Sequence, residues 1–226
     1  MSLFMPVTGF APPHSVFMTA SFPDYELIRA EIAALAARMI AEDGSDYGTA
    51  KRKAARQILG NARVNGEVLP DNTQIEEEVR IYNQLFFGDT QPVRLLELRK
   101  LALRVMTELE SFHPYLTGAV LNGTAGAHSD IHLQLFADSP KDVEIYLLNQ
   151  GISFEVSETP HFRGRNEPVE TVSFMTQKEG IHLSLYNRDD LRGALKSSGR
   201  VERADIAAVQ ALIDADEKRL EGQENQ

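Results

Sequence analysis

Hydrophobic residues in the first half of the chain recur every three or four positions, which is the spacing of one face of an α-helix. Ile28, Ile32, Leu35 and Met39 follow this spacing between residues 24 and 43. Further helices are predicted at 47–59, at 73–88, where Thr73-Gln74-Ile75-Glu76 resembles a capping box, and from about Pro92 to 113. The first 113 residues are therefore predicted to consist of helices and loops.

From Leu116 onward the hydrophobic period changes to two, which is typical of β-strands. Strands are predicted at 117–122, 131–137, 152–157, 171–175 and 181–186, and the last two form a hairpin through 177–180. Helices are predicted at 140–151 and 202–220, and the polar stretch 158–168, with His161, Arg163 and Arg165, reads as a loop. The pattern predicts an α+β fold, with an N-terminal helical region followed by a mixed β-sheet flanked by helices.

The size of the chain is sufficient for this arrangement, because 226 residues with 42% hydrophobic content can bury a substantial core. We expect a flexible N-terminal arm at 1–23, a helical region at 24–113 and an α/β domain at 114–222. The first twenty residues contain no Lys or Arg and are interrupted by Pro6, Pro12 and Pro13. These features are untypical of a secretory signal peptide.

Charge and composition exclude several classes of function. The 23 basic and 33 acidic residues give a formal net charge of −10, which disfavours general nucleic-acid binding. The chain has no cysteine and no apolar run long enough to cross a bilayer. We expect a soluble, cytoplasmic protein of bacterial type without membrane contact. The motifs of Gly-x-Ser-x-Gly hydrolases, His-Glu-x-x-His zinc enzymes and Gly-x-Gly-x-x-Gly dehydrogenases are absent from the sequence.

The most informative segment lies at 115–133, where a predicted strand, a glycine-containing turn and a second strand follow one another. Gly123 lets the backbone approach an anion closely, and the turn amides and the Thr124 hydroxyl can donate hydrogen bonds to phosphate oxygens. Asp130, at the mouth of the second strand, can hold a cation that neutralises those phosphates.

This order of elements resembles the nucleotidyltransferase superfamily that includes DNA polymerase β and the minimal nucleotidyltransferases. In that family a strand ends in Gly-Ser or Gly-Gly, and the next strand begins with a Ser-Asp-Ile-Asp-like stretch. Gly123-Thr124 resembles the first element and Ser129-Asp130-Ile131 the second, within a similarity that covers roughly 115–190. The resemblance implies a nucleotidyltransferase-like sheet, nucleotide contacts from Gly123, Thr124 and Ser129, and a divalent metal such as Mg²⁺ at Asp130.

More loosely, most of the chain resembles a proteobacterial group labelled nucleotidyltransferase-like or sometimes UDP-N-acetylmuramate-alanine ligase. A ligase of that kind is expected to have a Gly-Lys-Thr or Gly-Lys-Ser phosphate loop. The sequence contains neither string, so the nucleotidyltransferase-like label fits it better.

The sequence departs from the nucleotidyltransferase pattern in three ways. The family usually leaves nine or more residues between the Gly-Ser pair and the first aspartate. Here only the five residues 125–129 separate Thr124 from Asp130. His132 stands where the second carboxylate is expected, and His182 stands where the third is expected. A neutral imidazole adds no negative charge and cannot bridge two ions, so we expect two-metal phosphoryl transfer to be severely weakened.

The two histidines lie in similar strands, Ile-His-Leu-Gln-Leu-Phe at 131–136 and Ile-His-Leu-Ser-Leu-Tyr at 181–186. If these strands are neighbours, both imidazoles lie on the same face of the sheet. With Asp130 they then form either a two-histidine, one-carboxylate site that suits Zn²⁺, Mn²⁺ or Fe²⁺, or an ordinary hydrogen-bonded sheet face.

Two functions are compatible with this sequence. The first is a catalytically degenerate protein, or pseudoenzyme, that binds a nucleotide or a protein partner in the inherited cleft. The second is an active NTP-dependent nucleotidyltransferase in which Asp130 and a substitute carboxylate, Glu155, carry the chemistry. The first is favoured because the missing carboxylates are the groups that the reaction requires.

Overall fold

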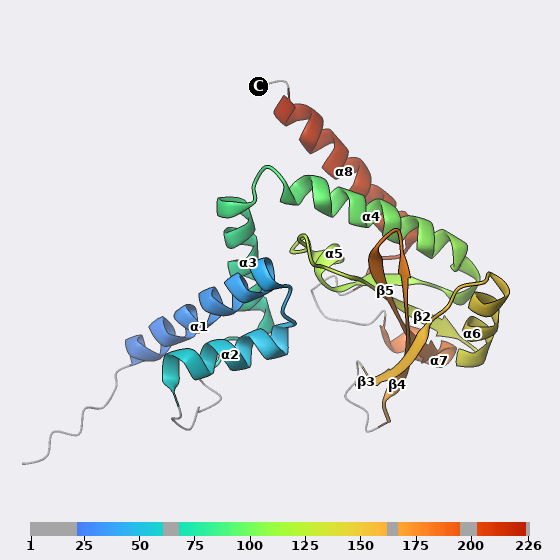
Figure 1. Cartoon of the computed structure of the whole chain (residues 1–226), viewed down its shortest axis with the longest axis horizontal. Coiled ribbons are helices and arrows are strands. Elements are labelled where there is room, and N and C mark those ends of the chain that lie inside the picture. The colour runs from blue at the N-terminus through green and yellow to red at the C-terminus, as the bar shows by residue number, and fades with distance from the viewer. Residues whose placement is uncertain (1–21, 61–67, 162–166, 195–202, 225–226) are drawn as a thin grey trace, which may run out of the picture.

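The computed structural model describes residues 22–60, 68–161, 167–194 and 203–224, and it confirms the α+β class. Figure 1 shows a group of three helices on one side and a mixed sheet with its own helices on the other. The predicted arm at 1–23 falls almost entirely outside the described residues, as do Arg163 and Arg165 of the predicted loop. Among the described helices, none is both long enough and apolar enough to cross a membrane.

The three N-terminal helices pack on one another and form a separate buried cluster. They are α1 (Phe22–Asp43), α2 (Tyr47–Leu59) and α3 (Asn72–Phe86). Alanines at the contact points, among them Ala36, Ala37 and Ala54, are fully buried and let the helix backbones approach closely. The predicted spans agree with these helices, but the capping box of α3 lies two residues earlier than expected. Asp71 is the N-cap, and it exchanges hydrogen bonds with Gln74.

Helix α4 (Gln91–Glu108) packs with the sheet rather than with the first three helices. Its buried residues Leu98, Ala102 and Met106 belong to the cluster that also contains the apolar residues of the strands. Two further helices, α6 (Pro140–Asn149) and α8 (Ile206–Glu224), contribute to the same cluster. The predicted division at residue 113 stays a prediction, since the buried contacts group α4 with the residues that follow it.

The sheet contains five strands in the order β1-β2-β5-β4-β3. Their bounds are β1 (Tyr115–Thr117), β2 (Ile131–Ala137), β3 (Glu155–Thr159), β4 (Val169–Thr176) and β5 (Glu179–Asn187). Strands β2 and β5 are parallel, and all other neighbours are antiparallel. The two histidine-containing strands are therefore adjacent, as expected, with His132 directly opposite His182.

The two faces of the sheet differ in character, because successive side chains of a strand point to opposite sides. Ile131, Leu133 and Leu135 of β2 lie on the face that α4, α6 and α8 cover. The opposite face is largely polar. Its far end is apolar, where Phe136 and Tyr186 pack with Leu191 of α7 (Arg188–Ala194).

Several predicted boundaries need correction. Residues 118–122, predicted as part of a strand, form the short helix α5 (Gly118–Asn122), whose first residue, Gly118, has a φ of +70°. Strand β3 starts at Glu155 instead of residue 152, and it continues into the predicted loop as far as Thr159. The last helix starts at Ile206 rather than near 202, and α7 was not predicted at all.

Candidate functional site

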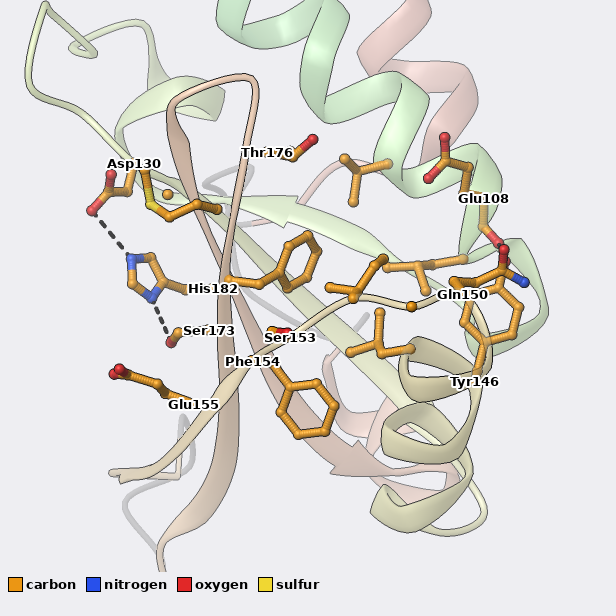
Figure 2. Close-up of a pocket in the computed structure, with 18 residues that line it drawn as sticks. Glu108, Asp130, Tyr146, Gln150, Ser153, Phe154, Glu155, Ser173, Thr176 and His182 are labelled. Carbon is orange, nitrogen blue, oxygen red and sulfur yellow. Dashed lines mark hydrogen bonds and ion pairs between the residues drawn. The ribbon is translucent and has the colours of Figure 1, made fainter.

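A cavity of about 1120 Å³ opens between α4, α6 and the β4–β5 hairpin. Figure 2 shows Asp130, His182 and Ser173 on one side of the β4–β5 ribbons, and Phe154, Tyr146 and Gln150 on the other. Asp130, Glu155 and His182 of the predicted site all line this cavity. The structure thus brings three of the seven predicted residues into one cavity, although they are distant in the sequence.

A row of polar side chains crosses all five strands at this position. Cross-strand pairing places the members opposite one another in the order Thr117, His132, His182, Ser173 and Glu155. Residues directly opposite each other point to the same face of a sheet, so the row is continuous on the polar face. This row contains both histidines and the predicted substitute carboxylate.

At the centre of the row, His182 makes a hydrogen bond with each of its ring nitrogens. Nδ1 lies 2.8 Å from the Ser173 hydroxyl, and Nε2 lies 3.1 Å from the Asp130 carboxylate. The side chains of His182 and Asp130 are 29% and 49% exposed, so the group is accessible from the cavity. Figure 2 shows the three side chains as one connected chain of hydrogen bonds.

Gly180 makes room for the carboxylate of this group. A Cβ atom placed on Gly180 would lie 2.7 Å from Asp130 Cγ and closer still to Oδ1. The Asp130 side chain therefore lies directly over the backbone of β5, two residues before His182. Any side chain at position 180 would have to displace it.

The ring of His132 packs against the ring of His182. The two rings are stacked, with centroids 4.8 Å apart and planes 17° from parallel. Loss of solvation by burial lowers the pKa of His132, and the charge of the adjacent His182 lowers it further. The charge of Asp130 acts in the opposite direction. His132 is thereby favoured in its neutral form beside the hydrogen-bonded histidine.

The predicted nucleotide contacts Gly123, Thr124 and Ser129 are not among the residues that line the cavity. The Thr124 side chain is buried, and its hydroxyl lies 2.7 Å from the Asn122 carboxamide oxygen and 3.2 Å from the Tyr47 hydroxyl. The Ser129 hydroxyl accepts a hydrogen bond from the Gly126 amide. Phosphate binding by this turn stays a prediction, and it would have to replace these internal hydrogen bonds.

The structure instead places a glycine of the expected kind directly after β1. Gly118 follows the last residue of the strand, is exposed and has a φ of +70°. Residues 120–129 separate Gly118-Ala119 from Asp130, and these ten residues match the spacing of nine or more that is usual in the family that the sequence resembles. Gly118-Ala119 thus matches the spacing of that resemblance better than Gly123-Thr124 does.

The predicted metal ligands Asp130, His132 and His182 are not arranged as a metal site. Stacked rings do not direct their nitrogens toward one point, and both nitrogens of His182 already have partners. In the described residues, no group of three or more His, Cys, Asp or Glu side chains is arranged to hold a metal ion. The site of Asp130, His132 and His182 does not fit a metal in this conformation, and metal binding there stays a prediction.

Sequence reasoning did not identify Ser173 or Gly180 as part of the site. Both lie in the hairpin that was predicted, but the connection was taken as four residues, 177–180. The structure has the two-residue turn Gln177-Lys178, in which both residues have positive φ. That turn places Thr176 opposite Glu179, and consequently Ser173 opposite His182.

Comparisons with known proteins add little to this geometry. No family model matches the sequence. No curated protein matches it either. Among solved structures, a chain in the structure of the GLD-2/RNP-8 complex aligns over 51% of this chain at 18% identity, with a TM-score of 0.29. The alignment spans 48% of that other chain, and a likeness at this level identifies neither a fold nor a function.

Proposed function

We propose that this chain is a nucleotidyltransferase-like protein that binds a nucleotide in the cavity beside Asp130 and does not carry out two-metal nucleotidyl transfer. The observation that supports this most is the pairing of His132 with His182 in adjacent strands. The sequence resemblance implies carboxylates at positions 132 and 182. Two imidazoles in their place leave Asp130 as the one acid of the expected set.

The cavity has the size and the lining that a nucleotide requires. Its volume of about 1120 Å³ is slightly above the range of roughly 300–1,000 Å³ that ligand sites span, so a nucleotide fits. Phe154, which is only partly buried, lines the cavity and offers aromatic surface to a base. Glu108, Asp130 and Glu155 line the same cavity, so a highly charged triphosphate is repelled unless a cation accompanies it.

The alternative, an active transferase, needs Asp130 and Glu155 to act on one reaction centre. Two catalytic metal ions lie about 3.5–4 Å apart. Strands β5 and β4 separate β2 from β3, so the backbones that carry these acids are about 14 Å apart at the usual strand spacing. Figure 2 shows His182 and Ser173 between the two carboxylates. This separation does not favour a shared metal site.

Titration calorimetry with AMP, ADP and ATP, each with and without Mg²⁺, tests the proposal. Without Mg²⁺ we expect the affinity to fall as the number of phosphates rises. Phe154→Ala should weaken binding by about tenfold, since stacking of a base on an aromatic ring is worth about 1–3 kcal/mol. Phe86→Ala, which removes an exposed ring on α3, is the matched control and should leave the affinity unchanged.

Substitution of Asp130 separates the two functions. Without Mg²⁺, Asp130→Asn should maintain or strengthen nucleotide binding, because it removes a negative charge beside the phosphates. Asp138→Asn, at the other end of β2, is the control. Transfer of radiolabelled nucleotide from an NTP to an acceptor, lost in Asp130→Asn but kept in Asp138→Asn, would establish the active transferase instead. Absence of any nucleotide binding would contradict the proposal and leave a protein partner as the ligand.

A further inference from the structure

The hydrogen-bonded chain of Ser173, His182 and Asp130 has the connectivity of a nucleophilic serine site. Such sites need a hydroxyl bonded to an imidazole and an acid that orients the imidazole from its other nitrogen. Both contacts are present, at 2.8 Å and 3.1 Å. We propose that Ser173 is a nucleophile that becomes acylated by esters, with His182 as its general base and Asp130 as the orienting group.

The direction of the hydrogen bonds follows from the chemistry of the end groups. An ionised carboxylate can only accept a hydrogen bond, so the Asp130 carboxylate accepts from Nε2–H of His182. In the neutral imidazole the other nitrogen, Nδ1, then has a free lone pair and accepts from the Ser173 hydroxyl. This is the tautomer that allows His182 to take the proton of the serine.

The surrounding fold fixes each of these groups. Ser173 and His182 are opposite residues of the β4–β5 hairpin, so backbone pairing sets their separation. The stacked ring of His132 limits rotation of the His182 imidazole, and Gly180 leaves the space for Asp130. Side chains on regular strands hold a site more rigidly than side chains on loops.

The lining of the cavity indicates the class of ester. Ser173 lies on the polar face of the sheet, whereas Phe174 and Leu147 are buried in the core on the helix-covered face, so polar side chains surround the Ser173 hydroxyl. Glu155 stands directly opposite Ser173 in the next strand, and Asp130 lies on the other side. These negative charges disfavour carboxylate-bearing or phosphate-bearing esters, so we infer a neutral ester.

The reaction balances without a further reagent. Ser173 Oγ attacks the carbonyl carbon and forms a new C–O bond, while its proton moves to His182 Nδ1. The bond between the carbonyl carbon and the alcohol oxygen breaks, and the alcohol leaves with the proton from Nδ1. Water then attacks the acyl-serine with the same proton transfers, releases the carboxylic acid and restores the Ser173 hydroxyl.

Turnover also requires donors for the oxyanion, so the sharpest test measures acylation of Ser173 itself. The full chain is treated with a fluorophosphonate probe and, separately, with p-nitrophenyl butyrate, and modified peptides are identified by mass spectrometry. We expect modification at Ser173 and a burst of p-nitrophenol that Ser173→Ala abolishes. Ser184→Ala, which removes a hydroxyl from the same sheet face that has no imidazole partner, should leave both signals intact.

Two further variants test the roles of the partners. His182→Gln should lower the acylation rate at least tenfold. Asp130→Asn should lower the rate constant of acylation while the KM for the ester is unchanged, because the carboxylate orients the base without contacting the acyl group. A purely structural role for Asp130 would instead alter both parameters together or lower the melting temperature.

Substrate charge provides an independent test. A p-nitrophenyl ester of a succinyl group should acylate Ser173 at least tenfold more slowly than the butyrate ester. Absence of modification at Ser173, or equal modification in Ser173→Ala, would overturn the proposal. Nucleotide binding in the proposed function does not require a reactive serine, so failure of either idea leaves the other standing.

Discussion

At the scale of single residues, the position of one carboxylate depends on the absence of a side chain. Asp130 lies over Gly180, where even a methyl group would be too close to Cγ and Oδ1. Gly180 does not have a positive φ, so alanine is compatible with its backbone. Position 180 therefore controls where Asp130 points without contributing a chemical group of its own.

Gly180→Ala should move the Asp130 carboxylate away from His182 and leave the hydrogen bond to Ser173 in place. The change in unfolding free energy should be small, because the displaced atoms are the end of a side chain that is half exposed. We expect a changed ¹⁵N shift at His182 Nε2, measured by NMR, with little change at Nδ1. Gly126→Ala, where a Cβ meets nothing within 4 Å, is the control. An unchanged Nε2 signal in Gly180→Ala would show that the missing side chain at position 180 does not determine where the Asp130 carboxylate lies.

The residues of the site were predictable to different degrees. Asp130 and His182 follow from period-2 patterning and the family resemblance, which also made their strands neighbours. Ser173 depended on the hairpin register, and register changes completely with the length of the turn. Gln177-Lys178 lacks the Asn-Gly or Gly signal that normally identifies a two-residue turn with positive φ, so the sequence left the length of this turn undetermined.

At the scale of elements, an acidic residue of helix α6, Glu144, lies next to an acidic residue of strand β4, Glu170. The pKa of Glu170 is raised to about 6, first by a hydrogen bond with Glu144, then by burial and by the charge of Glu144. Lys141 acts in the opposite direction. One oxygen of Glu170, Oε1, is buried without a hydrogen-bond partner among the described atoms. The pair is therefore most favourable when it shares a proton.

The sign of the pH dependence follows from this raised pKa. The protonated Glu170, hydrogen-bonded with Glu144, stabilises the folded protein. This contribution is fully present below the ordinary glutamate pKa of about 4.5, and it is lost as the pH rises through about 6. Glu170→Gln should thus make the protein more stable than wild type at pH 8, with the gain disappearing at pH 4.5. Urea unfolding at both pH values measures the difference. Glu31→Gln, on an exposed part of α1, should show no such dependence.

The same scale shows where sequence patterns failed to define elements. Helices with clear apolar stripes were located closely, whereas Gly118–Asn122 forms a helix despite an apolar, strand-like composition. Five residues are too few for the helical period to be distinguished from alternation. The positive φ at Gly118 ends β1 and starts this helix, and tertiary packing of Val120 and Leu121 stabilises it.

At the scale of the whole molecule, the turn after α5 connects the helical region to the sheet. Asn83 of α3 donates a hydrogen bond to the Thr124 carbonyl, and Tyr47 of α2 contacts the Thr124 hydroxyl. Gly44, at the end of α1, leaves no room for a side chain beside His128. The glycine-containing turn that was predicted to hold phosphate is thus the part of the sheet domain that contacts all three N-terminal helices.

A buried ion pair joins three other elements. Arg99 of α4 lies 2.6 Å from Asp216 of α8 and donates hydrogen bonds to the carbonyls of Val120 and Leu121 in α5. The side chains of Arg99 and Asp216 are only 6% and 8% exposed. The arginine therefore satisfies groups that have no access to water, and it fixes α5 and the start of the turn against the long helices.

Removal of this arginine should destabilise the whole molecule, because it leaves Asp216 and two carbonyls buried without their main partner. We expect Arg99→Met to lower the free energy of unfolding by about 3–5 kcal/mol, measured by urea denaturation. Lys100→Met is a matched control in the adjacent position, because Lys100 pairs with Glu217 between the same two helices but is half exposed. That control should lose no more than about 1 kcal/mol. In Arg99→Met/Asp216→Leu the unpaired charge is also removed, so part of the loss should be recovered. Equal losses in the two single variants would mean that burial of the Arg99–Asp216 pair does not determine its contribution.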